Sequence, residues 1–318
     1  MKKLRVGVVG AGYLGKFHAE KYAGMDHVEL VGVVDADRTQ AETVAAAVSA
    51  PAYTDYRDLL GGVDAVSIVV PTPTHFAVSK TFLQNNVDVL IEKPMTMILD
   101  EADELIEIAE ARGRIIQVGH LERFNPAVVA LREIVRAPLF IESHRLSLFQ
   151  PRGTDVSVVL DLMIHDIDII LNLAGSEVQT IHAAGTPVIT DLVDIANARL
   201  EFASGCVANV TASRISMKSE RKIRMFQREA YISVDFANRG ITVVRPGEGS
   251  PDSPVPHTVV EQMDFPQADA LDDELRSFVQ AVTLRQTPEV TGKMGRDALM
   301  VALNIMAQIQ KTSSRLTR

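Results

Sequence analysis

The first 120 residues repeat one pattern, in which a short and continuous apolar run precedes a stretch with helical spacing. The run LRVGVVG is followed by helical spacing over residues 13–22. In the same way, VELVGVVDAD is followed by helical spacing over 39–48, and DAVSIVV by helical spacing over 76–85. Strands that are apolar throughout indicate a parallel sheet covered by helices on both faces. The pattern therefore predicts a doubly wound α/β domain that ends near Gly119 or His120.

Three glycines occupy the first strand-to-helix turn of this domain, where Gly10, Gly12 and Gly15 form GxGxxG. The first glycine permits the tight turn, the second lets the backbone approach a pyrophosphate, and the third lets the helix pack on the strand. The helix N-terminus attracts the phosphate charge. This context predicts a dinucleotide-binding Rossmann domain, with Tyr13 and Leu14 also bordering the cofactor.

A carboxylate, Asp35, ends the second strand of the domain. At this position it can accept hydrogen bonds from the adenosine ribose, and it repels the 2′-phosphate of NADP. Arg38, three residues later, can pair with that phosphate or merely cover the adenine, so NADP stays open as the less favoured cofactor. We therefore predict NAD.

Two further segments follow strands at the carboxyl edge of the sheet, where open α/β folds bind ligands. Thr72, Pro73 and His75 lie in the first segment, and they are expected to border the cofactor. His75 has an equal alternative as a capping or solvent-facing residue of the loop. In the second segment, Lys93 can bind a substrate hydroxyl or relay a proton, whereas its alternative is a surface ion pair with Glu92.

The alternation of strands and helices stops at about residue 125. Runs with period-two spacing follow, among them VQTIHAAG, IANARLEF and KIRMFQREAYISVDF, and helices are expected near 270–284 and 294–310. Consecutive strands imply an α+β domain with a large, mainly antiparallel open sheet. We predict a boundary between residues 1–120 and 121–318, with a closing helix that can pack back on the first domain.

A mostly apolar helix, LDLMIHDIDIIL, carries buried charges. At about 100° per residue, one stripe of this helix contains Asp161, His165, Asp168 and Asn172, while Asp166 points the other way and has no assigned role. The stripe can bind a metal, form a structural network or move a proton of a polar substrate. Metal is disfavoured because no second cluster supplies ligands. Beside a dinucleotide, a histidine oriented by Asp161 or Asp168 is a suitable base.

Composition excludes several other classes of protein. The formal net charge of -9 and the pI near 5.4 argue against nucleic acid or an acidic membrane as a partner. Cys206 is the one cysteine, so an intramolecular disulfide is excluded and a reducing, cytoplasmic setting is expected. No apolar run reaches the roughly 20 residues that membrane insertion requires.

Taken together, these motifs resemble the Gfo/Idh/MocA family, which includes glucose-fructose oxidoreductase and inositol dehydrogenase. The glycine turn, the EKP sequence at Glu92 and the D-x-x-x-H-x-x-D helix carry the resemblance over nearly the whole chain. It implies oxidation or reduction at a sugar carbon, with Lys93 and His165 as the proton-handling pair and Asp161 orienting them. It also implies a homodimer or homotetramer, because the open sheet of the family commonly forms a subunit interface.

Narrower segments, such as GHLERFNPA and ESHRLSLFQPRGTDV, are similar to the members of that family that oxidise the 3-hydroxyl of UDP-N-acetylglucosamine for amino-sugar lipid A synthesis. This similarity implies a sugar-nucleotide substrate, whose diphosphate suits the fork of arginine. A free sugar, an inositol, another nucleotide sugar or a non-catalytic NAD-sensing role remains as an alternative. The substrate-binding residues expected on this basis are His120, Arg123, Arg145, Arg152, Asp161, His165 and Asp168.

The basic residues between 214 and 228 leave two interpretations open. Some of them can hold the diphosphate, or RKIR can alternate solvated charges with apolar residues on an exposed strand or a subunit interface.

Overall fold

The computed structural model describes residues 3–150, 156–248 and 257–316, which form two compact units. The first unit comprises the chain up to Phe124 together with Asp269–Leu299, and the second comprises Asn125–Ala268 together with the chain from Met300. The break after Phe124 lies close to the expected boundary. Residues 269–299 return to the first unit, so the chain passes between the two units more than once.

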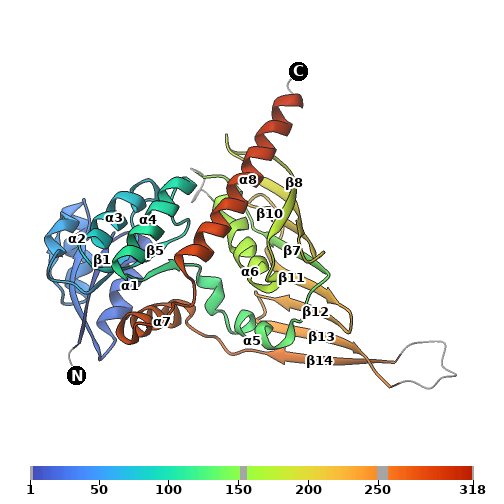
Figure 1. Cartoon of the computed structure of the whole chain (residues 1–318), viewed down its shortest axis with the longest axis horizontal. Coiled ribbons are helices and arrows are strands. Elements are labelled where there is room, and N and C mark those ends of the chain that lie inside the picture. The colour runs from blue at the N-terminus through green and yellow to red at the C-terminus, as the bar shows by residue number, and fades with distance from the viewer. Residues whose placement is uncertain (1–2, 151–155, 249–256, 317–318) are drawn as a thin grey trace. The chain divides into compact units, whose positions relative to one another are not determined.

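The first unit contains a parallel sheet with the strand order β3-β2-β1-β4-β5-β6 in the described part of the chain. Helices flank this sheet, and the order of its strands is that of a doubly wound dinucleotide fold (Figure 1). The elements are β1 (Leu4–Val9), α1 (Tyr13–Ala23), β2 (Val28–Val34), α2 (Arg38–Ala47), β3 (Ala52–Tyr53), β4 (Ala65–Ile68), α3 (His75–Gln84), β5 (Asp88–Glu92), α4 (Leu99–Arg112) and β6 (Ile116–Gly119). Short 3₁₀ turns lie at Tyr56–Leu59, Thr72–Thr74 and Leu121–Phe124.

Helix α7 (Ala270–Leu284) belongs to the first unit because its apolar face completes the core there. Leu275 and Phe278 are fully buried in one cluster with Tyr22 of α1 and Met25. Burying a large apolar side chain contributes about 1.5–3 kcal/mol. These contacts therefore offset the entropy cost of bringing distant parts of the chain together. Helix α8 (Gly292–Leu316) begins in this unit and ends in the second.

The second unit contains a sheet of eight described strands in the order β14-β13-β12-β11-β7-β10-β9-β8. All neighbouring pairs are antiparallel except β7 with β10, so the sheet is mainly antiparallel as expected. Its elements are α5 (Pro126–Ile134), β7 (Phe140–Leu146), a π-helical turn (Val159–Met163), α6 (Ile164–Ala174), β8 (Val178–Thr186), β9 (Ile195–Phe202), β10 (Val207–Ser213), β11 (Glu220–Gln227), β12 (Ala230–Asp235), β13 (Gly240–Pro246) and β14 (Thr258–Asp264).

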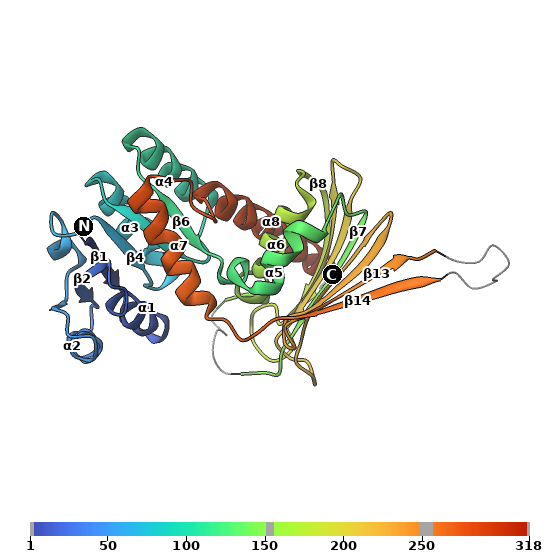
Figure 2. The same cartoon turned by 90° about the horizontal axis from the view of Figure 1, so that it is seen from below.

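One face of this sheet is covered by helices and the other is open. Along β7, burial alternates with the two-residue period of a strand, so Ile141, Ser143 and Arg145 face inward. Helices α5 and α6 lie on that covered side in both views of the ribbon (Figures 1 and 2). The open face therefore carries the alternate residues of each strand.

In the described ranges, no helix has both the length and the apolar character needed to cross a membrane. The same ranges contain no group of three or more His, Cys, Asp or Glu side chains arranged to hold a metal ion.

Candidate functional site

The glycine turn lies between β1 and α1, and its backbone explains the motif. Gly10 has a φ of +102°, and a Cβ added there would lie 2.5 Å from the carbonyl oxygen of Val69. A Cβ on Gly15 would lie 1.8 Å from the carbonyl oxygen of Gly10, whereas one on Gly12 would meet open space. The turn is therefore closed on the protein side and open at the N-terminus of α1, which is the shape that a pyrophosphate needs.

Asp35 supports the same turn from the end of β2. Its Oδ2 accepts a hydrogen bond from the backbone N–H of Ala11 at 2.7 Å, and its Oδ1 accepts one from the N–H of Asp37 at 3.0 Å. Arg38 is largely exposed, and its guanidinium lies 3.7 Å from Glu42. The carboxylate is therefore fixed beside the glycine turn, and Arg38 has an acidic neighbour on its own helix.

His75 is a buried link between two loops at the carboxyl edge of the sheet. It is 1% exposed, with Nε2 2.8 Å from the carbonyl oxygen of Val70 and Nδ1 3.0 Å from that of Pro94. Burial is the largest influence on this imidazole and lowers its pKa. The alternative in which His75 faces solvent is wrong, because the ring is enclosed between two backbone carbonyls.

Lys93 follows β5 directly, and Glu92 is the last residue of that strand. The backbone N–H of Lys93 donates to Oε2 of Glu92 at 3.3 Å, and Nε2 of His18 in α1 lies 3.3 Å from Oε1. Sequence reasoning assigned no role to His18, which is fully buried. The carboxylate of Glu92 is therefore held from the core rather than paired at the surface.

The helix that carries the polar stripe begins with an irregular turn. Val159–Met163 is π-helical, with hydrogen bonds to the fifth residue along the chain, and α6 begins at Ile164. A constant 100° step therefore does not hold across Asp161, and its place on one stripe with His165 stays a prediction. Such π turns recur at functional sites. Within the regular part of the helix, Asp168 is buried while His165 and Asn172 are half-buried.

Asp166, the aspartate outside the stripe, lies against β7. Arg145 Nε is 3.2 and 3.1 Å from its two carboxylate oxygens, and Nη2 is 2.9 Å from Oδ1. Both side chains are buried, at 4% and 1% exposure. This bidentate pair gives Asp166 the role that the sequence did not provide, and it uses the guanidinium of Arg145 to hold α6 on the sheet.

The comparisons with known proteins agree with this architecture. Residues 4–120 match the model of an oxidoreductase family with an NAD-binding Rossmann fold, and residues 142–233 match the GFO/IDH/MocA C-terminal domain. The UDP-N-acetylglucosamine 3-dehydrogenase of Acidithiobacillus ferrooxidans is 39% identical over 311 residues, which is 98% of each chain. The chain belongs to the Gfo/Idh/MocA family of oxidoreductases.

A solved structure and one more relative show how far the likeness extends within the Gfo/Idh/MocA family. A solved structure of the A. ferrooxidans enzyme has a TM-score of 0.92, covering 98% of this chain and 99% of that one. The scyllo-inositol 2-dehydrogenase (NAD(+)) of Bacillus subtilis is 28% identical over 91% of this chain and 89% of its own. Family, fold and oxidoreductase class therefore agree with the expectations from the sequence.

The other expected site residues of this Gfo/Idh/MocA protein divide by burial. Tyr13 is 66% exposed beside the glycine turn, with Leu14 and Thr72 half-buried and Pro73 exposed. His120 and Arg123 are buried, and Arg123 Nη2 lies 3.5 Å from Glu289 of the same unit. Arg152 lies outside the described residues.

The basic residues between 214 and 228 include two on the open face of the sheet, and both have acidic neighbours. Lys222 Nζ lies 3.6 Å from Asp235, and Arg224 Nη2 lies 2.5 Å from Glu142. These two side chains fit the interpretation as exposed strand or interface charges better than the interpretation as a diphosphate site.

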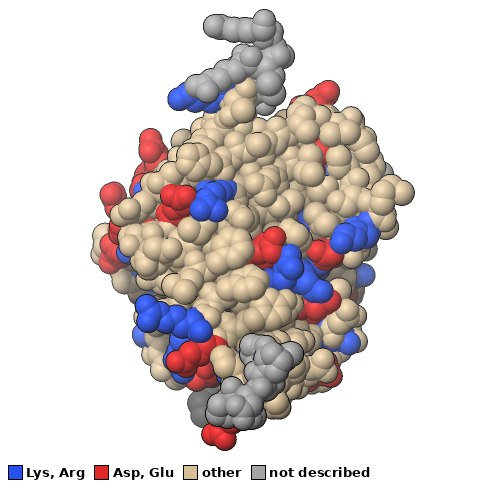
Figure 3. Space-filling view, turned by 90° about the vertical axis from the view of Figure 1, so that its right-hand side faces the viewer, with Lys and Arg blue, Asp and Glu red and all other residues tan. Residues whose placement is uncertain are grey.

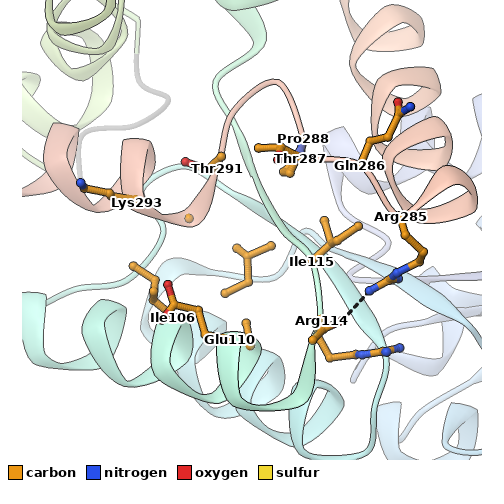
Figure 4. Close-up of a pocket in the computed structure, with 14 residues that line it drawn as sticks. Ile106, Glu110, Arg114, Ile115, Arg285, Gln286, Thr287, Pro288, Thr291 and Lys293 are labelled. Atoms are coloured by element: carbon orange, nitrogen blue, oxygen red, sulfur yellow. Dashed lines mark hydrogen bonds between the residues drawn. The ribbon is translucent and has the colours of Figure 1, made fainter. Parts of the chain in front are cut away.

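The first unit contains a pocket whose lining includes no residue of the glycine turn or of the end of β5 (Figure 4). It has a volume of about 670 Å³ and is lined by α4, by the segment between α7 and α8, and by the start of β6 at Ile115 and Ile116. The start of β6 is the amino edge of a parallel sheet, whereas Gly10 and Glu92 lie at the carboxyl edge. Cofactors of this fold bind at the carboxyl edge, so this pocket is not the candidate site.

Proposed function

We propose that this protein oxidises the 3-hydroxyl of UDP-N-acetylglucosamine with NAD, giving a 3-keto sugar nucleotide for later transamination in amino-sugar lipid A synthesis. The observation that carries the proposal is the 39% identity to the A. ferrooxidans enzyme along 98% of both chains. The intact set of Lys93, Asp161 and His165 supports a catalytic role over an NAD-sensing one. The single buried cysteine, Cys206, is compatible with a reducing cytoplasm.

The proposed cofactor fits the first unit. Gly12 leaves open space at the N-terminus of α1 for the pyrophosphate, and the fixed carboxylate of Asp35 suits a ribose with free hydroxyls, which favours NAD over NADP. The chemistry that a bound nicotinamide would supply here is an acceptor for the hydride from C3 of the sugar.

Side chains of the protein transfer the proton and bind the substrate. His165 takes the proton of the 3-hydroxyl with Lys93 assisting, because an imidazole changes charge near neutral pH. Asp161 and Asp168 orient the imidazole or hold a neighbouring hydroxyl. His120, Arg123 and Arg152 are proposed substrate contacts, and the guanidinium groups suit the diphosphate. Arg145 acts on the substrate indirectly, through the helix that it holds with Asp166.

A substrate panel tests the proposed activity. Purified protein with NAD is offered UDP-N-acetylglucosamine, its 4-epimer UDP-N-acetylgalactosamine, UDP-glucose, N-acetylglucosamine and two inositols, and NADH absorbance is followed. We expect the highest kcat/KM with UDP-N-acetylglucosamine. A higher kcat/KM with an inositol or a free sugar would replace the proposed substrate, and cofactor binding without turnover of any member would favour the NAD-sensing role.

The roles of Lys93 and His165 require a separate test. His165→Ala and Lys93→Ala should each lower kcat by about 10²–10⁴-fold while NAD still binds, because a positioned acid or base contributes a factor of this size. Near-normal turnover in both variants would refute the proposed roles. Glu104→Gln, at an exposed ion pair with Lys80 on the first unit, is the control.

We further propose that the chain forms a homodimer or homotetramer through the open face of its eight-stranded sheet. Phe226 is 38% exposed there, with its ring centroid 5.7 Å from that of Phe140 and 5.1 Å from that of Tyr231. Figure 3 shows a broad surface of mostly uncharged side chains with a few charged groups among them. Such an extended face favours association.

Light scattering tests this assembly. The wild-type chain should have a mass of two or four times 34.7 kDa, and Phe226→Glu should lower it by burying a charge at the interface. The control, Leu284→Glu, adds the same charge at a 55%-exposed position of α7. A monomeric wild-type chain would contradict the proposal.

A further inference from the structure

A group of buried polar side chains surrounds Glu92, the residue before Lys93, in the first unit. Glu92 ends β5, His18 belongs to α1, and Glu274 belongs to α7. His18 and Glu274 have no exposed surface, and the Glu92 side chain is 13% exposed. Two carboxyl groups and an imidazole at such depth require an explanation, because burying a charge is costly unless it is used or compensated.

The carboxylate of Glu92 is enclosed on three sides. His18 Nε2 lies 3.3 Å from Oε1, and the backbone N–H of Lys93 donates to Oε2 at 3.3 Å. On the third side is β6, where a Cβ added to Gly119 would lie 2.9 Å from the carboxylate. Because the same carboxylate binds the peptide N–H of Lys93, its position fixes the backbone from which that side chain extends.

The pKa values of the two carboxyl groups, Glu92 and Glu274, are shifted in opposite directions. Burial by itself raises the pKa of Glu92, but the neighbouring His18 and Lys93 outweigh burial, so the pKa is lowered overall. Burial, and then the charge of Glu92, raises the pKa of Glu274 well above its ordinary value. Neither oxygen of Glu274 has a hydrogen-bond partner among the described residues. Of the two groups, Glu92 therefore loses its proton more readily than Glu274.

The topology relates this charge to the cofactor. A dinucleotide fold binds one nucleotide on each half of its sheet, and Asp35 of β2 marks the adenosine half. Strands β4, β5 and β6 form the other half, so Glu92 and Lys93 end a strand on the nicotinamide side. The oxidised nicotinamide ring is cationic and the reduced ring is neutral. Lys93 alone would repel the oxidised ring, and the carboxylate of Glu92 offsets that repulsion.

We propose that Glu92 is a positioning residue for Lys93, and that its buried charge favours binding of the oxidised, cationic cofactor relative to the reduced one. This inference rests on the proposed use of NAD. Beyond the use of NAD, it assigns the preference between the two redox forms to Glu92, a side chain outside the proton-transfer pair.

Cofactor binding without substrate tests the charge. The dissociation constants of NAD⁺ and NADH are measured for the wild-type chain, Glu92→Gln and the exposed control Glu104→Gln, by calorimetry and by the fluorescence of NADH. Glu92→Gln should raise the ratio Kd(NAD⁺)/Kd(NADH) roughly tenfold, as expected for one charge acting over several ångströms at a partly screened site. The control should leave the ratio unchanged. Equal changes for both redox forms in Glu92→Gln would overturn the role of the charge.

A second variant separates position from charge. Gly119→Ala forces the carboxylate of Glu92 to move but leaves it ionised. It should keep the wild-type ratio of dissociation constants and lower kcat for the best sugar of the panel at least tenfold, because the Lys93 peptide loses its anchor. Normal kcat in this variant would overturn the positioning role.

Circular dichroism and Tm identify variants that fail to fold. If Glu92→Gln fails, Glu92→Asp replaces it, since it retains the charge but shortens the reach to His18. This variant should keep the ratio and lose turnover, and a shifted ratio would overturn the proposal. A wild-type chain that binds neither redox form refutes the proposed function itself, whereas binding with an unmoved ratio in Glu92→Gln refutes only the inference about charge.

Discussion

Two carboxyl groups, one in each unit, are equally deeply buried but are stabilised differently. In the second unit, Asp166 is 1% exposed and receives the planar fork of Arg145. In the first unit, Glu274 has no exposed surface, and a carboxylate, Glu92, raises its pKa. The first arrangement balances a charge with a charge, and the second removes the charge with a proton. The difference teaches that depth of burial alone does not predict how a site responds to mutation or pH.

The largest expected effect on stability comes from removing the carboxylate of Asp166, which is paired with Arg145. Asp166→Ala should lower the free energy of unfolding by about 3–5 kcal/mol, because Arg145 would keep its charge in the interior without that bidentate partner. Urea unfolding followed by circular dichroism measures the loss.

The double variant Arg145→Met/Asp166→Leu is the matched control for this prediction. It replaces both charges by apolar side chains, so most of the lost stability should return. A double variant as unstable as Asp166→Ala would mean that packing, rather than the uncompensated charge, dominates at this position.

A second buried aspartate in the same unit, Asp194, is held by backbone donors and by the Thr190 hydroxyl at 2.7 Å, and Arg214 Nε lies 3.9 Å from its Oδ1. Asp194 has no exposed surface, and its Oδ2 accepts hydrogen bonds from the backbone N–H groups of Val188, Ile189 and Thr190 at 2.7–2.9 Å. Burial raises its pKa, but these hydrogen bonds outweigh burial and lower the pKa to about 2.

Asp194→Asn should therefore lower the free energy of unfolding by about 2 kcal/mol at neutral pH, which is less than the loss expected for Asp166→Ala. Because the folded pKa is depressed, the stabilisation is fully present above the unfolded value near 3.8 and disappears as the pH falls through about 2. Unfolding curves of both chains between pH 2 and pH 7 check this. A stability gap that does not shrink toward low pH would rule out the ionised carboxylate as its source.

The sequence predicted the features of the site that depend on local pattern. The glycine turn, the strand that ends at Glu92 and the apolar helix that carries His165 were all expected from residues close together in the chain. Each is coded within a few turns of backbone, where spacing and residue type are sufficient. The same holds for α7, whose expected bounds are those of the structure.

The parts that were missed depend on contacts between distant segments or on an irregular backbone. Arg145 was expected to bind substrate, although the period-two pattern of β7 places it on the inward face with Ile141 and offered a way to foresee its burial. The π turn at Asp161 has no spacing signature, so the sequence did not predict it. Strand β14 was not expected, because TVVEQMD is short and polar at its end.

The smallest predicted effect concerns Glu274, and it has the opposite dependence on pH. Since burial and Glu92 raise its folded pKa, the stability linked to this group is fully present below the unfolded value near 4.5 and is lost as the pH rises through the higher folded pKa. Glu274→Gln keeps the shape of the neutral acid but cannot ionise. Near pH 5 it should therefore change the free energy of unfolding by at most about 1 kcal/mol.

As the pH is raised from 5 to 9, Glu274→Gln should gain stability relative to the wild-type chain. At position 274 only the wild-type chain has a carboxyl group, and this group ionises at a lower pH in the unfolded state than in the folded state. Tm measured at intervals across this range for both chains gives the slope of the difference. Glu104→Gln, on α4 at the ion pair with Lys80, is the control for the substitution itself. A flat difference for Glu274→Gln would mean that Glu274 ionises normally in the folded protein, and the cluster around Glu92 would then contain two negative charges instead of one.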